Sequence, residues 1–366
     1  MSLLTGHDAW LHLFHVRGLG PIGFNALLEA FGTAEAICAA PPRQLASVVS
    51  RQLAAAIAGD DSRAARQAAA DWLAADATRS LQTRLDADYP LALAQSPAAP
   101  PLLFLHGRRE LLSRPLFAIV GSRHASAQGI RDAGRFARAL ADTGYTIVSG
   151  LAAGIDAAAH DGAVDTPAAT VAVIGTGIDR VYPACNRPLA RRIAGHGLIV
   201  SEFPLGTPPL AAHFPRRNRI IAGLGAGCLV VEAGLRSGSL ITARQAAEAG
   251  REVFAIPGSI HSPLSRGCHA LIRDGARLTE SLDDILAELP PLPALPPVAG
   301  PAAVPESEFA AGDARLLAAL GFDPVDADTL AQRTGLTVEG VLAMLLPLEL
   351  AGRVAPLPGG RYQRVV

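Results

Sequence analysis

The 366-residue chain contains no lysine, so its 32 cationic side chains other than histidine are all arginines. An arginine presents a planar fork of donors that matches phosphate oxygens, whereas a lysine is a point charge. Cysteine is also scarce, and the four residues Cys38, Cys185, Cys228 and Cys268 form no close pair. This spacing suggests neither a disulfide framework nor a zinc motif. We therefore expect no metal and no cofactor.

Long apolar runs are missing as well, although 50% of the residues are hydrophobic. No uninterrupted span is long enough to cross a bilayer. The opening segment MSLLTGHDAW lacks the basic and apolar regions of a signal peptide. We therefore expect a cytoplasmic protein that does not bind membranes, with a length that allows two or three domains.

The formal net charge of -1 averages over unlike parts of the chain. Residues 101–305 carry 20 arginines against 16 acidic residues, whereas residues 1–100 carry 7 against 9 and residues 306–366 carry 5 against 8. The basic surplus is concentrated between Gly175 and Arg219. A local basic groove is enough to bind the backbone of a nucleic acid.

Apolar runs that read as strands alternate with helices and glycine-rich loops in the middle of the chain. These runs are 116–120, 146–149, 170–174, 228–231 and 253–256. Strands and helices at this spacing predict an α/β fold with a doubly wound, parallel, Rossmann-like sheet over residues 100–288. The loops after parallel strands share one edge of the sheet, where helix N-termini bind anionic ligands.

The loops at this edge supply the candidate phosphate-binding and strand-binding residues. They are Gly121, Ser122, Arg123, Gly150, Gly154, Arg180, Arg187, Phe214, Arg216, Arg217, Asn218, Arg219, Ser237, Gly238 and Ser239. Some alternatives stay open. Asn218 either binds a base or caps a helix, and Phe214 either stacks on a base or belongs to the core. One arginine of the 216–219 cluster is expected to brace the loop through a salt bridge.

Several segments follow one another in the order found in one family. They are GSR at 121–123, GLAAGID at 150–156, GTGIDRVYP at 175–183, SEFPLG at 201–206, FPRRNRIIAGL at 214–224, VVEAGLRSGSLITA at 230–243 and PGS at 257–259. With these motifs the chain resembles DNA-processing protein A, the DprA/Smf family, over roughly residues 100–286. The resemblance implies a bacterial single-stranded DNA-binding protein of natural transformation, which protects incoming strands and loads the RecA recombinase on them. It also implies a homodimer, which we expect to form through Leu271 and Ile272.

Two enzyme interpretations compete with DNA binding. Asp156 and His160 are four residues apart, so on a helix they share a face and form either an acid–base pair or a structural cap with a packed histidine. The fold also resembles phosphoribohydrolases of the LOG type, but the loop EAGLRSGSLITA has Arg236 in its middle and no glutamate after Thr242. We therefore predict no enzymatic activity. A protein-interaction scaffold is a third possibility.

The flanking parts of the chain differ from the middle in composition. Residues 1–85 are alanine-rich and read as a helical, SAM-like or helix-hairpin-helix-like domain, in which the glycines of 17–23 form either a phosphate-binding hairpin or a plain turn. Residues 289–305 are proline-rich and predict an extended linker. Residues 306–366 predict a winged helix whose third helix, apolar and acidic, suits a protein-contact or structural role better than groove reading.

Overall fold

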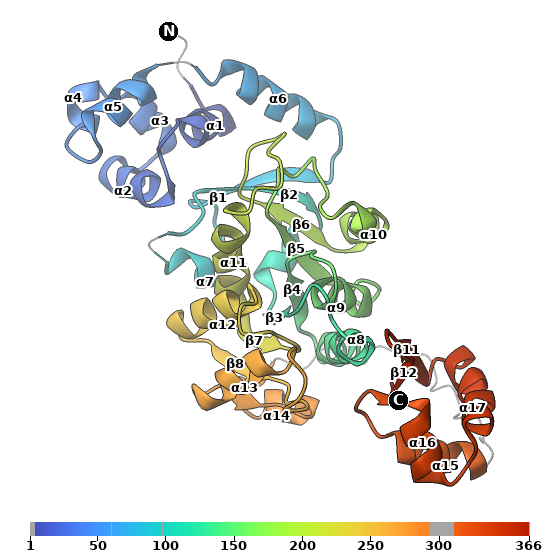
Figure 1. Ribbon diagram of the computed structural model, residues 1–366. Coiled ribbons are helices and arrows are strands. Elements are labelled where there is room, and N and C mark those ends of the chain that lie inside the picture. Colours follow the sequence, from blue (N-terminus) through green and yellow to red (C-terminus); the bar gives the residue numbers. More distant parts are fainter. Residues whose placement is uncertain (1–3, 60, 97, 293–310, 366) are drawn as a thin grey trace.

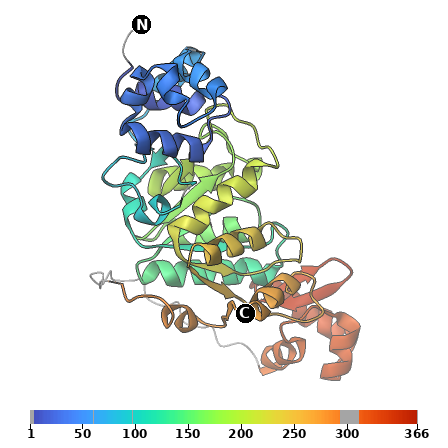
Figure 2. The same ribbon diagram turned by 90° about the vertical axis from the view of Figure 1, so that its left-hand side faces the viewer.

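The computed structural model describes residues 4–59, 61–96, 98–292 and 311–365 as three units (Figure 1). A helical unit lies at one end, a large sheet covered by helices forms the middle, and a winged-helix unit lies at the other end. Figure 2 shows the same order from the side. The predicted α/β fold with two flanking units is confirmed. Most of the predicted linker, 289–305, falls outside the described residues.

Short helices fill the N-terminal unit. They are α1 (His7–His15), α2 (Pro21–Phe31), α3 (Ala34–Ala39), α4 (Pro42–Leu45), α5 (Arg51–Ala58) and α6 (Arg63–Ala74). Thr33 and Ser50 start two of them, and each side chain accepts a hydrogen bond from a backbone N–H three residues on. Their apolar faces form a core that continues onto the edge of the sheet at Leu81 and Phe104. The helical unit is thereby held against the sheet.

The central sheet has the strand order β1-β2-β6-β5-β4-β3-β7-β8-β9. Its strands are β1 (Arg79–Thr83), β2 (Leu102–Gly107), β3 (Leu116–Val120), β4 (Thr146–Ser149), β5 (Thr170–Ile174), β6 (Leu198–Ser201), β7 (Gly225–Val230), β8 (Glu252–Ala255) and β9 (Arg277–Leu278). From β6 to β9 neighbouring strands run parallel, whereas β2 is antiparallel to β6 and β1 to β2. The sheet is therefore mixed at one edge.

The position of β1 corrects the predicted helical domain, which extended to about residue 85. The segment Arg79–Thr83 pairs with β2 and belongs to the sheet. Only Leu81 is apolar among its five residues, so no alternating pattern marks it as a strand. By contrast β3, β4 and β5 begin and end where the sequence predicts, because their buried runs are continuously apolar or end at a glycine.

Helices cover both faces of the sheet. One face carries α7 (Leu91–Ala94), α11 (His213–Leu224), α12 (Ser239–Glu248) and α13 (Arg266–Arg273), and the other carries α8 (Ala127–Asp142), α9 (Ile155–Ala163), α10 (Arg187–His196) and α14 (Leu282–Leu286). Two short 3-10 helices, η1 (Arg109–Ser113) and η2 (Ala184–Asn186), lie in loops. The strand order reverses between β3 and β7, and a crevice opens at such a switch point.

The C-terminal unit has the order of a winged helix. It contains α15 (Ala311–Leu320), β10 (Val325–Asp326), α16 (Ala327–Thr334), α17 (Val338–Leu350), β11 (Val354–Leu357) and β12 (Arg361–Arg364). The three strands form a separate sheet, and the helices share a core around Leu330 and Leu345. Arg131 of α8 donates a hydrogen bond of 2.8 Å to the carbonyl of Gly352, so this unit contacts the central one.

Candidate functional site

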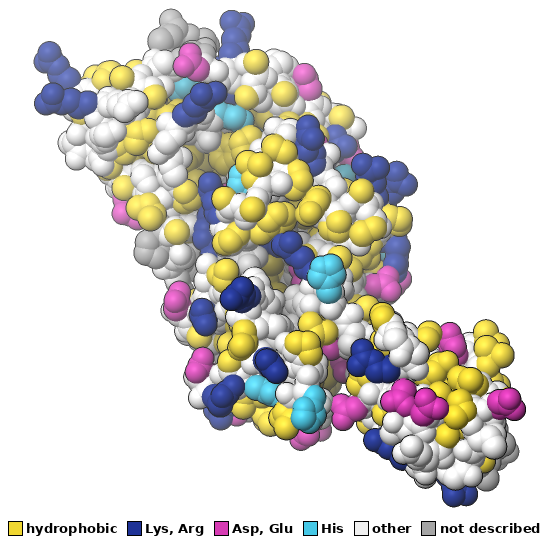
Figure 3. All heavy atoms as spheres, viewed as in Figure 1, with side chains coloured by type: hydrophobic (Ala, Val, Ile, Leu, Met, Phe, Trp, Pro, Cys, Tyr) yellow, Lys and Arg dark blue, Asp and Glu magenta, His cyan; other side chains and the backbone are white. Residues whose placement is uncertain are grey.

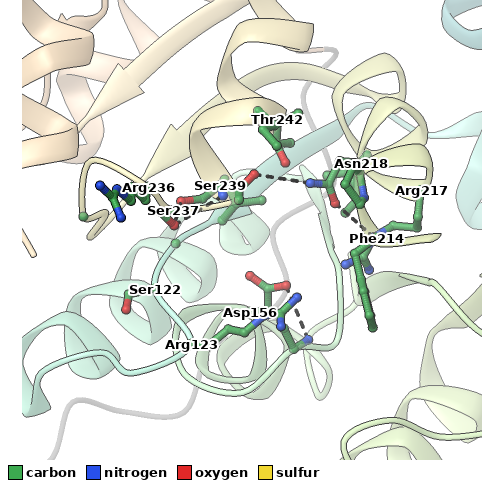
Figure 4. A pocket seen from close by; sticks show the side chains of 18 of the residues that line it. Ser122, Arg123, Asp156, Phe214, Arg217, Asn218, Arg236, Ser237, Ser239 and Thr242 are labelled. Carbon is green, nitrogen blue, oxygen red and sulfur yellow. Dashed lines mark hydrogen bonds between the residues drawn. The ribbon is translucent and has the colours of Figure 1, made fainter. Parts of the chain in front are cut away.

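A pocket of about 730 Å³ opens at the switch point between β3 and β7. Its walls are the loops that follow these strands, the start of α9 and the first turns of α11 and α12. In Figure 4 Ser237, Ser239 and Asn218 lie along one side, and Arg123 and Asp156 lie along the other. We call this cavity the main pocket.

Most of the predicted site residues meet here. Those that line the main pocket are Gly121, Ser122, Arg123, Phe214, Arg217, Asn218, Ser237, Gly238 and Ser239. Gly154 lies directly behind the wall, with a φ of 77° and no room for a side chain, since a Cβ would lie 2.9 Å from the carbonyl oxygen of Arg123. Such a backbone conformation favours glycine. Gly154 therefore shapes the loop that holds Arg123.

An arginine lies over an aromatic ring at the mouth of the pocket. The guanidinium of Arg123 is 5.0 Å from the ring centroid of Phe214, and that ring in turn lies 5.8 Å from the ring of Tyr182. Tyr182 is 46% exposed, and Arg123 is exposed as well. Phe214 is therefore a half-buried wall residue that contributes to the pocket, and Tyr182 is a lining residue that the prediction missed. Its position in the segment GTGIDRVYP at 175–183, directly after a predicted strand, could have indicated it as a lining residue.

Arg217 is buried, with 3% of its surface exposed. Its guanidinium donates to the carbonyl of Gly150 at 2.5 Å and to the carbonyl of Val173. Gly150 directly follows β4, and Val173 lies near the end of β5. Burial lowers the pKa of Arg217 to about 10, so the side chain remains a cation at neutral pH. Arg217 therefore connects two strand ends and places a fixed positive charge beneath the main pocket.

The other arginines of the cluster point elsewhere. Glu202, whose side chain is 1% exposed, forms ion pairs with Arg219 and, at 3.3 Å, with Arg216. The expected structural salt bridge thus involves two arginines, and neither lines the main pocket. Arg180 and Arg187 are exposed and also lie outside its lining. The fold therefore does not place these two predicted DNA-contacting arginines in the main pocket.

Asn218 cannot cap a helix, because α11 begins at His213 and includes it. Its side chain is buried, accepts from Nε of Arg217 at 3.2 Å and donates to the carbonyl of Gly238 at 3.3 Å. Gly238 precedes α12 without a side-chain cap. The first N–H groups of α12 are nevertheless partnered, because that of Ser239 donates to the Ser237 hydroxyl and those of Leu240 and Ile241 donate to the carbonyls of Ser237 and Gly238. The serine hydroxyls on either side of Gly238 lie 2.6 Å apart. The positive dipole end of α12 and these hydroxyls favour an anion at this helix start.

Asp156 and His160 do not form the acid–base pair that their spacing allows. His160 is fully buried, where its ring hydrogen-bonds the hydroxyl of Thr170 at 2.7 Å and accepts from the N–H of Leu151 at 3.2 Å. Burial lowers the pKa of His160 to about 3, so its ring is neutral. Burial raises the pKa of Asp156, opposed by the nearby Arg217. The N-cap of α9 is Gly154, and Asp156 lies inside the helix. The alternative that Asp156 caps this helix is therefore wrong as well.

Glu232, the first residue of the loop EAGLRSGSLITA that corresponds to the loop of LOG-type hydrolases, is engaged in the fold. Its carboxylate accepts from the hydroxyl of Ser126 at 2.5 Å and from the Ser126 N–H at 2.9 Å. Ser126 is the N-cap of α8, so the glutamate holds a helix start in place. This geometry does not favour glycosidic hydrolysis.

The charged side chains that line the main pocket are mostly cationic, and the aromatic rings of Phe214 and Tyr182 are part of the same lining. Arg123, Arg217 and Arg236 are its arginines, and Asp156 is its one acidic residue. Aromatic faces beside arginines provide stacking surfaces for bases and charge for phosphates. The arrangement can therefore hold a flexible, negatively charged strand with splayed bases.

The predicted dimer contact is only partly exposed in the single chain. Leu271 of α13 is 8% exposed and packs in the core, and Ile272 packs partly against the same core. The apolar patch expected there is therefore reduced to Ile272. Within the described residues no helix is both long and apolar enough for a membrane span, and no cluster of three or more histidine, cysteine or acidic residues suits a metal.

Comparison with known proteins reveals matching families and structures. A model of the DNA recombination-mediator protein A family matches residues 80–290, and a model of the DprA winged helix domain matches residues 300–360. Protein Smf of Escherichia coli (strain K12) is 45% identical over 282 residues, which is 74% of each chain.

Two solved structures extend the comparison. DNA processing protein A of Streptococcus pneumoniae matches with a TM-score of 0.67 and 39% identity, over 77% of this chain and 98% of that one. DNA processing protein A of Helicobacter pylori, whose structure concerns a unique single-stranded DNA binding mode, matches with a TM-score of 0.51 and 28% identity, over 57% and 94%. These findings confirm the resemblance seen in the sequence motifs. The chain belongs to the DNA recombination-mediator protein A (DprA/Smf) family.

Proposed function

We propose that the chain binds single-stranded DNA in the main pocket, without catalysis and without a cofactor. The observation that carries the proposal is the stack of Arg123 on Phe214 above the buried cation of Arg217. The aromatic pair of half-buried Phe214 and exposed Tyr182 offers a stacking surface for any base, and the exposed guanidinium of Arg123 binds the adjacent phosphate. The single-stranded DNA binding of the Helicobacter pylori relative supports the same assignment.

The family supports a wider role in natural transformation. We propose that the protein acts in the cytoplasm as a homodimer, protects incoming single strands and loads RecA on them. A dimer would align two pockets on one strand and raise avidity without new contacts. Changing the partly buried Ile272 to glutamate should give a monomer with weaker DNA binding and poor RecA loading. A monomeric wild-type protein in light scattering at micromolar concentration would contradict the dimer.

The binding proposal is tested by fluorescence anisotropy with labelled oligo-dT. Arg123→Ala should weaken binding about fivefold at about 0.1 M salt and reduce the salt slope by about 0.7, since one phosphate contact is lost. Phe214→Ala should cost about 1 to 3 kcal/mol, the range for base stacking. Arg135→Ala is the matched control, because Arg135 is an exposed arginine of α8 away from the main pocket. Wild-type affinity of both pocket variants would refute the proposal.

A further inference from the structure

A second cavity, of about 360 Å³, lies where the helical unit meets the sheet. One wall is the turn between α1 and α2, with Arg17, Gly18 and Gly20, and the other contains Phe203 and Arg216. We call this cavity the junction pocket. It gathers the glycine turn that the sequence singled out and an arginine that the main pocket does not use.

Positive charge dominates the junction pocket. Arg17 is exposed and makes no hydrogen bond or ion pair with the described residues. The side chain of Arg216 is 45% exposed, and its guanidinium lies 5.4 Å from the ring centroid of Phe203. Glu202 is the acidic lining residue, but its carboxylate is buried and also paired with Arg219. Two arginines from two units therefore face one cavity with one shared, already paired carboxylate.

The start of helix α2 adds a positive dipole end to these charges. Helix α2 has 11 residues and begins at Pro21, with Gly20 as an N-cap that provides no side-chain hydrogen bond. The first N–H groups of such a helix have no partner within the helix and carry its positive dipole end. Gly18 has a φ of 86°, which lets the turn present this helix start beside Arg17.

Helix α11 separates the junction pocket from the main pocket. Phe214 and Arg217 line the main pocket, whereas Arg216 lines the junction pocket. The two cavities thus flank the first turns of one helix, and a helix with its side chains is about 10 Å wide. A strand that fills the main pocket can therefore reach the junction pocket within a few nucleotides.

We propose that the junction pocket is a second contact site for the same single strand, in which Arg17 and Arg216 bind a backbone phosphate and the helical unit becomes part of the DNA path. This inference rests on the proposed function of the main pocket. It assigns the glycine turn of the N-terminal unit a role in binding phosphate, and it explains why Arg216 points away from the main pocket.

The test compares strand lengths in fluorescence anisotropy on the full chain. A single-strand binding groove covers roughly 4 to 16 nucleotides. Oligo-dT of about 6 nucleotides is therefore short enough to occupy one pocket, and oligo-dT of about 20 nucleotides is long enough to extend beyond it. Arg17→Ala should weaken the long strand about fivefold at about 0.1 M salt, the effect of one lost phosphate contact, and leave the short strand unchanged. Arg17→Lys should restore most of the long-strand affinity, because it keeps the charge.

Arg63→Ala provides the control, since Arg63 is an exposed arginine of the helical unit outside the junction pocket. If Arg123→Ala weakens both lengths while Arg17→Ala weakens neither, the main pocket stands and the junction site is refuted. Equal losses for both lengths in Arg17→Ala would also overturn it, because the effect would then not depend on an extended strand. If Arg123→Ala affects neither length, the proposed function itself fails.

Discussion

The main pocket and helix α17 of the winged-helix unit are opposite in chemistry. The pocket presents Arg123 over Phe214, with helix N-termini and hydroxyls around it. Helix α17 presents an apolar stripe at every fourth position: Val338, Leu342, Leu346 and Leu350 are exposed by 37%, 42%, 58% and 83%. Its charged residues are two glutamates. The winged-helix unit in Figure 3 likewise shows hydrophobic and acidic side chains side by side.

This contrast shows that the shape of a unit does not determine what it binds. The third helix of a winged helix often enters the major groove of DNA, where basic side chains contact phosphates. Helix α17 has the position of such a helix but no basic residue, so its apolar stripe is unsuited to a phosphate backbone. The Rossmann-like sheet, which hosts many unrelated functions, here carries the cationic surface.

The largest effect should come from removing the buried cation of the pocket. Arg217→Leu leaves the carbonyls of Gly150 and Val173 without their donor, so we expect a loss of about 3 kcal/mol in the free energy of unfolding. Urea denaturation followed by circular dichroism measures it. Arg361→Leu, at an exposed position of the winged-helix hairpin, is the matched change and should stay within about 0.5 kcal/mol. Similar losses in both variants would remove the contrast between the two regions.

Acid should destabilise the sheet unit through His160. The unfolded chain binds a proton on this ring below the ordinary pKa of 6.5, whereas the folded protein binds it only near 3. Stability therefore falls as the pH drops below 6.5, by about 2 kcal/mol at pH 5 from this residue. Urea denaturation at pH 7 and pH 5 should show a smaller loss for His160→Gln than for the wild type. Equal losses would mean that His160 takes up no extra proton on unfolding.

Duplex DNA should bind at least about tenfold more weakly than oligo-dT of the same length, or about 1.4 kcal/mol. The main pocket admits splayed bases, which a duplex does not offer, and α17 has no cation to hold a duplex. Anisotropy at one salt concentration measures both affinities. Equal affinity for duplex and single strand would assign DNA contacts to another surface, with the winged-helix unit as the first to examine.

The smallest effect is expected from the apolar stripe. Leu346→Glu adds a charge at a side chain that is already 58% exposed, so both the fold and the affinity for oligo-dT should stay within about twofold of wild type. Phe214→Ala, measured in the same titration, provides the contrasting loss. A fivefold loss in Leu346→Glu would mean that the winged-helix unit takes part in binding the strand.

The sequence predicted the parallel core well because its signals are local. Three central strands are apolar runs followed by glycine loops, and the structure keeps their limits. The antiparallel edge was missed, since β1 is stabilised by pairing with β2 across 19 or more residues and not by its own pattern. A helix capped by Asn218 would begin after that residue, whereas α11 begins at His213 and includes Pro215, which is tolerated in a first helical turn.

The candidate site was predictable in composition but not in the direction of each side chain. Arg216, Arg217 and Arg219 are equivalent in the sequence, yet one faces the junction pocket, one is buried and one pairs with Glu202. Their orientation depends on where α11 begins and on carbonyls contributed by β4 and β5. Such partners lie 44 and 67 residues away, so no local pattern reveals them.

Gly150 and Arg217 should be inherited together. A Cβ at position 150 would lie 2.6 Å from the guanidinium carbon of Arg217, so only glycine leaves space for the arginine to reach the strand ends. If position 217 were not arginine, the space beside position 150 would no longer be needed, and a residue larger than glycine would fit there. In an alignment of relatives, these two positions are therefore expected to covary, and a lineage that replaces one should replace the other.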